Sequence, residues 1–240
     1  MATSPSASGP PRPGGVRTTR RRGRTSAAKE RVLTEVAPRW SAAGDGWDDG
    51  SLQACFGTDG PLLVDIGVGD GTATRAWAAA HPDARVLAVE LHRPGLAKLL
   101  AELDRDGPAN VRVAEADAVE VVAGLDPGGA RAIRVLFPDP WPKRRHVGRR
   151  LVDRAFAVAV ADALEPGGVL ALATDWPDYA EHMRTMVGAE PRLVPEGDGA
   201  RPDRPITAYE RRGLDAGRPV ADLRYRRLPD PAAPRPSTST

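Results

Sequence analysis

Three carboxylates and a glycine-rich turn form the first group of residues that could do chemistry. The turn Gly67-Val68-Gly69-Asp70-Gly71 follows an apolar run, and Asp65 lies just before it. Glycines have no side chains, so a ligand can approach the backbone closely. Glu90 and Asp117 each end a later apolar run. A carboxylate at the position of Glu90 can accept hydrogen bonds from both hydroxyls of a ribose, and Asp117 could meet an adenine edge.

The spacing of these groups discriminates between nucleotide ligands. A dinucleotide site would have its third glycine at position 72, which is Thr72 here. Three carboxylates disfavour a ligand with phosphates and favour one that carries an adenosine and a positive charge. We therefore expect Asp65, Gly67, Glu90 and Asp117 to bind S-adenosyl-L-methionine as a methyl donor. The alternative is a glycine turn with polar caps at strand ends.

A proline-rich segment forms the second group, with the sequence Leu136-Phe137-Pro138-Asp139-Pro140-Trp141-Pro142. Its three prolines fix φ and lack N–H donors, so we expect a stiff loop and no helix. Asp139 could accept hydrogen bonds from the N–H edge of a flipped base, with Trp141 as a stacking face. The alternative is a structural turn with Trp141 in the core.

Cationic residues follow this loop directly. Residues 143–150 (KRRHVGRR) hold six cationic or titratable side chains, beginning with Lys143. Elsewhere such a run would indicate a solvated face, but beside a reactive loop it indicates a track for phosphates. Further along the chain, Asp175 ends another apolar run, and additional polar groups come from the segment Thr207, Ala208, Tyr209 and Glu210.

Alternating strand and helix patterns position these groups. Buried strands are predicted at 61–67, 85–91, 110–116, 131–138 and 169–175, with a final strand at 221–227. Helices are predicted at 72–81, 93–107, 117–123 and 151–164, where residues 165–168 (EPGG) break the last one. This alternation implies a Rossmann-like α/β fold, with a parallel sheet covered by helices on both faces. Ligands of such sheets bind at the carboxyl ends of the strands, where the groups above lie.

Composition indicates one globular domain with two tails. The chain has 240 residues, of which 41% are hydrophobic and 28% charged. We expect a disordered basic arm at 1–27, one domain at 28–228 and a disordered tail at 229–240. No apolar run could cross a bilayer and no signal peptide is evident, so we expect a cytoplasmic protein. The single Cys55 excludes an intrachain disulfide, and the histidines show no metal-ligand spacing, so we expect no metal.

Charge is distributed unevenly along the chain. Residues 1–31 carry eight basic side chains and one carboxylate, a net charge of +7, whereas the whole chain has +2 and the remainder therefore −5. A basic arm on a mildly acidic body indicates a polyanionic partner, because neutralised phosphates release counterions. The alternative is a solvated tail that only aids solubility.

Together these motifs closely resemble the bacterial tRNA (guanine-N(7)-)-methyltransferases. The similar blocks, in the same order, are DIGVGDG, AVELHRPG, NVRVAEADAVEV, LFPDPWPKRRHVGRRLV, LEPGGVLALATDWPDYAEHM, TAYERRG and DLRYRR, which fall within residues 16–227. The proline loop with its basic continuation is the specific part, since the glycine turn would fit any class I methyltransferase. The resemblance implies a class I S-adenosylmethionine-dependent methyltransferase fold, with a mostly parallel seven-stranded sheet and an antiparallel last strand.

The resemblance also implies an activity and roles for individual residues. The activity is methyl transfer from S-adenosyl-L-methionine to N7 of a guanine in the variable loop of tRNA, without a metal. The family's donor-binding positions match Asp65, Glu90 and Asp117, and Asp139 matches both a donor-binding and a catalytic position. The tRNA-contacting positions match Lys143, Asp175, Thr207, Ala208, Tyr209 and Glu210. Asp65 stands where glutamate is more usual, and Tyr209 where phenylalanine is commoner.

Other functions stay open from the residues themselves. Pro138-Asp139-Pro140-Trp141 distantly resembles the loop of amino-group methyltransferases, so the acceptor could be an adenine or a protein nitrogen. A non-catalytic RNA-binding protein on the same fold is a further alternative. The implied partner is tRNA, no membrane partner is expected, and the chain could be a monomer or a homodimer.

Overall fold

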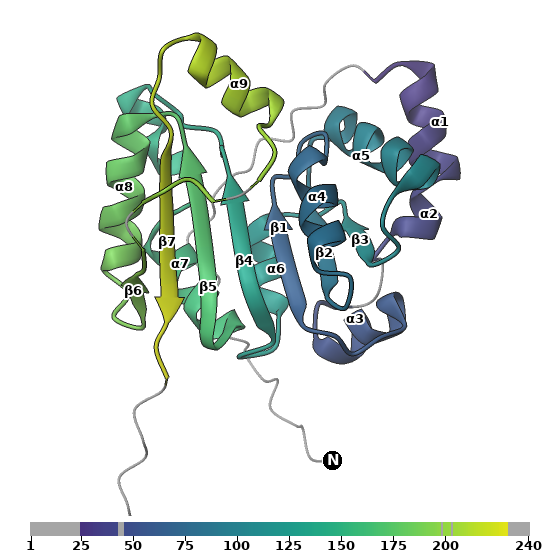
Figure 1. Ribbon diagram of the computed structural model, residues 1–240, viewed down its shortest axis with the longest axis horizontal. Helices are drawn as coiled ribbons and strands as arrows, with labels where there is room; N and C mark the ends of the chain where they lie inside the picture. Colours follow the sequence, from purple (N-terminus) through teal and green to yellow (C-terminus); the bar gives the residue numbers. More distant parts are fainter. Residues whose placement is uncertain (1–24, 43–45, 198, 203, 230–240) are drawn as a thin grey trace, which may run out of the picture.

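The computed structural model describes residues 25–42, 46–197, 199–202 and 204–229. Within these ranges seven strands form one sheet in the order β3-β2-β1-β4-β5-β7-β6 (Figure 1). The strands are β1 (Leu62–Ile66), β2 (Arg85–Val89), β3 (Val111–Ala114), β4 (Ala130–Leu136), β5 (Leu164–Thr174), β6 (Leu193–Pro195) and β7 (Ala221–Arg227). Strands β1 to β5 pair in parallel, whereas β7 is antiparallel to both of its neighbours. The expected class I methyltransferase fold is confirmed.

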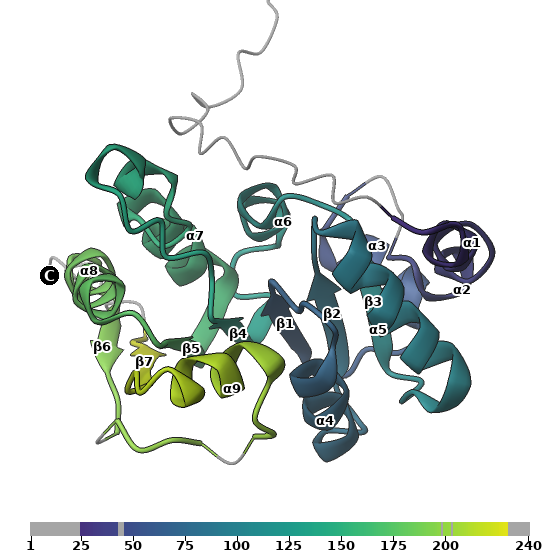
Figure 2. The same ribbon diagram turned by 90° about the horizontal axis from the view of Figure 1, so that it is seen from above.

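Helices cover both faces of this sheet. They are α1 (Ala27–Glu35), α2 (Ala37–Trp40), α3 (Asp49–Phe56), α4 (Thr72–Ala80), α5 (Arg93–Asp106), α6 (Ala118–Gly124), α7 (Arg154–Ala163), α8 (Pro177–Gly188) and α9 (Ala208–Asp215), together with a 3₁₀ helix η1 (Arg144–Arg149). Seen from above, α6 and α7 lie on one side of the sheet and α4 and α9 on the other (Figure 2). Helix α9 lies beyond the edge toward which β4 and β5 point (Figure 1).

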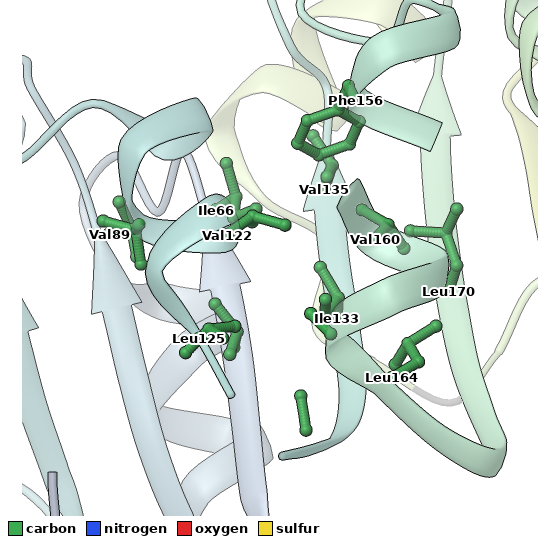
Figure 3. Packing of buried hydrophobic residues seen from close by; sticks show 14 of the residues in the cluster. Ile66, Val89, Val122, Leu125, Ile133, Val135, Phe156, Val160, Leu164 and Leu170 are labelled. Atoms are coloured by element: carbon green, nitrogen blue, oxygen red, sulfur yellow. The ribbon is translucent and has the colours of Figure 1, made fainter. Parts of the chain in front are cut away.

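Two apolar clusters hold the helices against the sheet. In the larger one, side chains of α6 and α7 such as Val122 and Phe156 meet Ile66, Ile133 and Val135 of the central strands (Figure 3). Alternate residues of a strand face opposite sides of the sheet, so Leu63 belongs to the second cluster, with α4 and α5. Removal of this apolar surface from water stabilises the scaffold at about 25 cal/mol per Å².

The predicted elements differ from the structure mainly at their ends. Asp153 caps α7, accepting a hydrogen bond from the Phe156 amide, so this helix begins at Arg154 and not at residue 151. Residues 165–168 end no helix, because β5 already begins at Leu164 and continues through them, with a register shift against β4. Strand β4 stops at Leu136, since Phe137 turns into the left-handed region at φ 52°.

The tails and the domain boundary are only partly covered by these ranges. Residues 1–24 of the predicted arm and 230–240 of the predicted tail lie outside the described residues. Of the eight basic residues counted in the segment 1–31, Lys29 and Arg31 belong to α1, which begins at Ala27, one residue before the predicted start of the domain.

Candidate active site

A pocket of about 410 Å³ lies at the carboxyl edge of the sheet. That volume is within the range of small-molecule sites, about 300–1,000 Å³. Its lining comes from six segments of the chain. They are the glycine turn after β1, the end of β2, the turn between β3 and α6, the proline loop after β4, the end of η1 with Leu151, and α9. The pocket therefore forms where the strand order predicts a ligand site.

The glycine turn and Glu90 are joined at the floor of this pocket. Glu90 accepts hydrogen bonds from the amide of Gly69 at 2.9 Å and from the amide of His92 at 2.7 Å. Gly67 and Gly69 have φ of 72° and 57°, the left-handed region that glycine adopts without strain. An added Cβ on Gly67 would meet nothing within 4 Å, so the backbone there is open to a ligand.

Asp65 is not brought to this pocket. It is buried beside α4, where Arg134 of β4 donates to its two oxygens at 3.0 and 2.6 Å and the Thr74 hydroxyl donates at 2.7 Å. The guanidinium of Arg134 also lies 4.2 Å from the centre of the Trp77 ring. Asp65 thus fixes α4 and β4 against β1, directly below the glycine turn, and its expected donor contact stays a prediction.

Asp117 lies at the border of the pocket. Its carboxylate accepts a hydrogen bond from the Val119 amide at 2.9 Å and so caps α6. The residues on either side, Ala116 and Ala118, line the pocket. A side chain at this position can satisfy the helix and still lie beside a bound base.

The proline loop forms the upper wall. Both Phe137 and Trp141 have positive φ, at 52° and 44°, and such strained backbone in non-glycine residues concentrates at functional sites. Asp139 lies between them, lines the pocket and is exposed. Its carboxylate accepts no hydrogen bond from any residue that the structure describes, so its oxygens are available to a ligand.

Cations without carboxylate partners follow the loop on η1. Lys143, Arg144 and Arg145 are exposed, and none of them forms an ion pair within the described ranges, whereas most arginines elsewhere in those ranges do. Arg149 lies 5.0 Å from the centre of the Trp141 ring and lines the pocket. Desolvation, followed by the charges of Arg149, Arg145 and Lys143, lowers the pKa of His146. This surface therefore presents positive charge beside the pocket.

The predicted residues near α9 divide into structural and accessible ones. Thr207 caps the helix, accepting from the Glu210 amide at 3.2 Å, and Ala208 is exposed. Glu210 is buried, where desolvation alone would raise its pKa, but hydrogen bonds from Arg201 and Arg204 outweigh that effect and lower it.

Tyr209 is part of that helix, and Asp175 at the end of β5 contacts it. Tyr209 is 48% exposed, lines the pocket, and places its ring 3.2 Å from where a Cβ of Gly69 would stand. Asp175 is held by Arg218 at 2.7 Å and packs against Gly213, so α9 is fixed to the end of β5. Of the segment 207–210, Tyr209 is the residue that lines the pocket.

Sequence reasoning missed α9 as a helix and missed Arg149 and Arg212 as pocket residues. A signal for α9 was present, because Thr207 followed three residues later by Glu210 is the pattern of a capping box. Arg212 lies over the Tyr209 ring at 4.6 Å, a contact that follows only from the helical turn between them.

Two further searches bear on alternative sites. A hollow of about 650 Å³ lies between α6 and α7, away from the glycine turn, and its Asp162 and Arg192 are already paired at 2.5 Å. Within the described residues, no helix has the length and apolarity needed to cross a membrane, and no His, Cys, Asp or Glu side chains group in a way that could hold a metal ion.

Comparison with known proteins identifies relatives over most of the chain. A family model described as "Putative methyltransferase" matches residues 59–223. The tRNA (guanine-N(7)-)-methyltransferase of Alkalilimnicola ehrlichii is 44% identical over 221 residues, which cover 88% of this chain and 92% of that protein. The enzyme of the same name from a Nocardioides species is 42% identical over 211 residues, covering 87% of this chain and 85% of that protein.

Solved structures share the fold at lower identity. The 16S rRNA methyltransferase KamB aligns with a TM-score of 0.55 and 19% identity, over 75% of this chain and 94% of that one. A 16S rRNA (adenine(1408)-N(1))-methyltransferase from Catenulisporales acidiphilia aligns with a TM-score of 0.53 and 19% identity, over 78% and 94%. Fold and strand-end pocket together define a class I methyltransferase. More narrowly, the chain belongs to the tRNA (guanine-N(7)-)-methyltransferase family.

The buried Asp65–Arg134 pair leads to a prediction about stability. Asp65→Ala leaves the Arg134 guanidinium buried without its partner, so we expect a loss of about 3–5 kcal/mol in the free energy of unfolding. The double variant Asp65→Ala/Arg134→Met removes the stranded charge and should recover most of that loss. Denaturant unfolding measures both. The exposed Asp59, changed to Ala, serves as the control and should stay within about 0.5 kcal/mol of wild type. A double variant as unstable as the single one would contradict this reasoning.

Proposed function

We propose that this protein transfers a methyl group from S-adenosyl-L-methionine to N7 of a guanine in tRNA, in the variable loop, and forms N7-methylguanosine. Family membership supports the activity, since relatives 42–44% identical carry that name. One observation on this chain supports the proposal most directly. Asp139 lies at the pocket wall with no hydrogen-bond donor among the described residues, and cations without carboxylate partners follow it on η1.

The pocket residues fit the proposed donor. Gly67 leaves the backbone open, Glu90 lies at the end of β2 where a ribose would be held, and Asp139 adds a second carboxylate to the lining. The cations Arg149 and Arg212 both lie against aromatic rings. The two carboxylates suit an adenosine that carries a positive charge, whereas the two arginines suit anionic groups such as the phosphates of RNA. When bound, S-adenosyl-L-methionine supplies a methyl group on a positively charged sulfur.

To methylate tRNA, the protein has to hold the acceptor base against a flat surface and the RNA backbone with positive charges. Trp141 offers a ring face for stacking, and Asp139 can accept hydrogen bonds from the N1–H and amino group of a guanine. Lys143, Arg144 and Arg145 can neutralise the phosphates next to that base. Guanine N7 has an unprotonated lone pair, so no residue has to remove a proton before attack.

Catalysis then depends on positioning and on charge. Holding both reactants in line supplies the proximity contribution, and a carboxylate near the purine stabilises the positive charge that develops there. In this scheme Asp139 orients the guanine and offsets its charge, and Glu90 holds the donor. Asp65 acts indirectly, by fixing the β1 end that carries the glycine turn.

Mapping the modified base tests the function. Purified full-length protein is incubated with methyl-labelled donor and an unmodified tRNA transcript, and the RNA is digested to nucleosides. We expect label in N7-methylguanosine. Label in a methylated adenosine would instead support the amino-group alternative. Label nowhere, with no binding of S-adenosylhomocysteine by calorimetry, would support the non-catalytic alternative.

A prediction about Asp139 follows from its lack of protein partners. Asp139→Ala should lower the single-turnover methylation rate about a hundredfold or more, because a preorganised charge at the reacting base is lost. Asp139→Asn keeps much of the shape without the charge and should be intermediate. Since no described residue donates to this carboxylate, the melting temperature should hardly change. Wild-type rates in Asp139→Ala would remove the residue from this role.

A prediction about the basic arm concerns salt dependence. Deleting residues 1–24 removes six arginines, and each arm arginine that contacts a phosphate contributes about 0.9 to the slope of log K against log salt. We therefore expect weaker tRNA binding with a flatter salt dependence and unchanged affinity for S-adenosylhomocysteine. Filter binding across a salt series measures the slope, and an unaltered slope would refute an RNA-binding role of the arm.

A further inference from the structure

Arg150 ends the basic run but is not part of its exposed surface. Its side chain is only 2% exposed, whereas Lys143, Arg144, Arg145 and Arg149 before it are exposed. A buried guanidinium cannot neutralise an RNA phosphate at the surface. The interpretation of residues 143–150 as one continuous phosphate track is therefore wrong at Arg150, which must be explained by its contacts inside the protein.

Those contacts join the proline loop to α8. The Nε of Arg150 donates to the carbonyl of Pro140 at 2.9 Å, and its terminal nitrogen donates to Asp178 at the start of α8. The guanidinium also lies 4.8 Å from the centre of the Tyr179 ring, which is fully buried. The hydrogen bond from Arg150 lowers the pKa of Asp178, as expected for a partner that stays ionised.

The loop needs such a donor because its own backbone offers few. Pro138, Pro140 and Pro142 have no N–H, so the segment from Pro138 to Pro142 has only the amides of Asp139 and Trp141. Neither amide donates to a residue that the structure describes. The loop begins at the Phe137 amide, which donates to the Ala173 carbonyl at 2.8 Å. Beyond that point, the Pro140 carbonyl is where the rest of the protein holds the loop backbone.

Pro140 stands between the two residues that face the acceptor. We propose that Arg150 is a positioning residue for methyl transfer, which fixes Asp139 and Trp141 by holding the Pro140 carbonyl against α8. This inference rests on the proposed function, in which Asp139 orients the base. The proposal gives two adjacent arginines different roles. Arg149 lies against the Trp141 ring at the pocket, whereas Arg150 holds the loop from inside the protein.

Two measurements on the full-length Arg150→Lys variant test the proposal. Lysine keeps the charge but loses the planar fork that reaches Pro140 and Asp178 together and lies over Tyr179. We expect faster hydrogen–deuterium exchange at the Phe137 amide, because its hydrogen bond to the Ala173 carbonyl, where the loop begins, should open more often once the Pro140 carbonyl is released. At saturating donor and tRNA, the single-turnover methylation rate should fall about tenfold to a hundredfold, since small misplacements of reacting groups have large effects. The Kd for tRNA should stay close to that of wild type.

Arg154→Lys is the matched control, with the same substitution at an exposed arginine four residues further on. It should leave both measurements unchanged. If Arg150→Lys does not fold, Asp178→Asn provides the second variant. The side chain of Asp178 is 72% exposed, so the change should be tolerated, and it removes the charged partner that holds the guanidinium. As in Arg150→Lys, hydrogen–deuterium exchange should rise and the methylation rate should fall, but both changes should be smaller.

Each contrary outcome overturns a distinct claim. Unchanged exchange at the Phe137 amide would show that Arg150 does not hold the loop. Faster exchange with a wild-type rate would remove the positioning role, and a loss confined to the Kd for tRNA would make Arg150 an RNA contact instead. If the wild-type protein forms no N7-methylguanosine, the proposed function fails, while the exchange comparison still decides whether Arg150 holds the loop.

Discussion

Parallel strands end at the same edge of a sheet, and this geometry brings the pocket residues of the protein together. Glu90 follows β2, the glycine turn follows β1 and the proline loop follows β4, so three segments far apart in sequence meet around one pocket. The hydrogen bond from Gly69 to Glu90 then ties two of those ends to each other. Because the strands are neighbours in the sheet, any ligand that contacts one end also contacts the others.

Charge is arranged in two ways around this edge. Inside the protein, the buried charges Asp65, Arg134, Arg150 and Glu210 all have ionic partners, as burial requires. At the pocket, Asp139, Lys143, Arg144 and Arg145 form no ion pair with any described residue. Charges that the protein leaves uncompensated can still be neutralised by a ligand. This contrast is the reason why the proposed function assigns the RNA backbone and the base to this surface.

The sequence predicted six of the seven described strands and the glycine turn, because their signals are local, but it did not predict the short β6. Apolar runs that end in carboxylates mark β1, β2 and β3 without reference to the rest of the chain. What it could not predict depends on contacts across the fold. Arg134 lies 69 residues from Asp65 in the sequence, and only strand pairing brings it near enough to bind that carboxylate. Arg150 likewise belongs to a run of cations, and its burial follows from the packing of α8.

Gly69 illustrates how a motif can serve two constraints at once. Its lack of a side chain suits a closely approaching ligand, which is what the sequence indicates. In the structure the same space is also bordered by Tyr209, whose ring lies 3.2 Å from where a Cβ would stand. Helix α9 carries that ring on the α4 side of the sheet (Figure 2) and is fixed there by Glu210 with Arg201 and Arg204. A side chain at position 69 would therefore press on the Tyr209 ring, which would have to shift by a few tenths of an ångström, and it would hold a non-glycine residue at a left-handed φ of 57°. The glycine thus serves the packing of the pocket wall as well as the approach of a ligand.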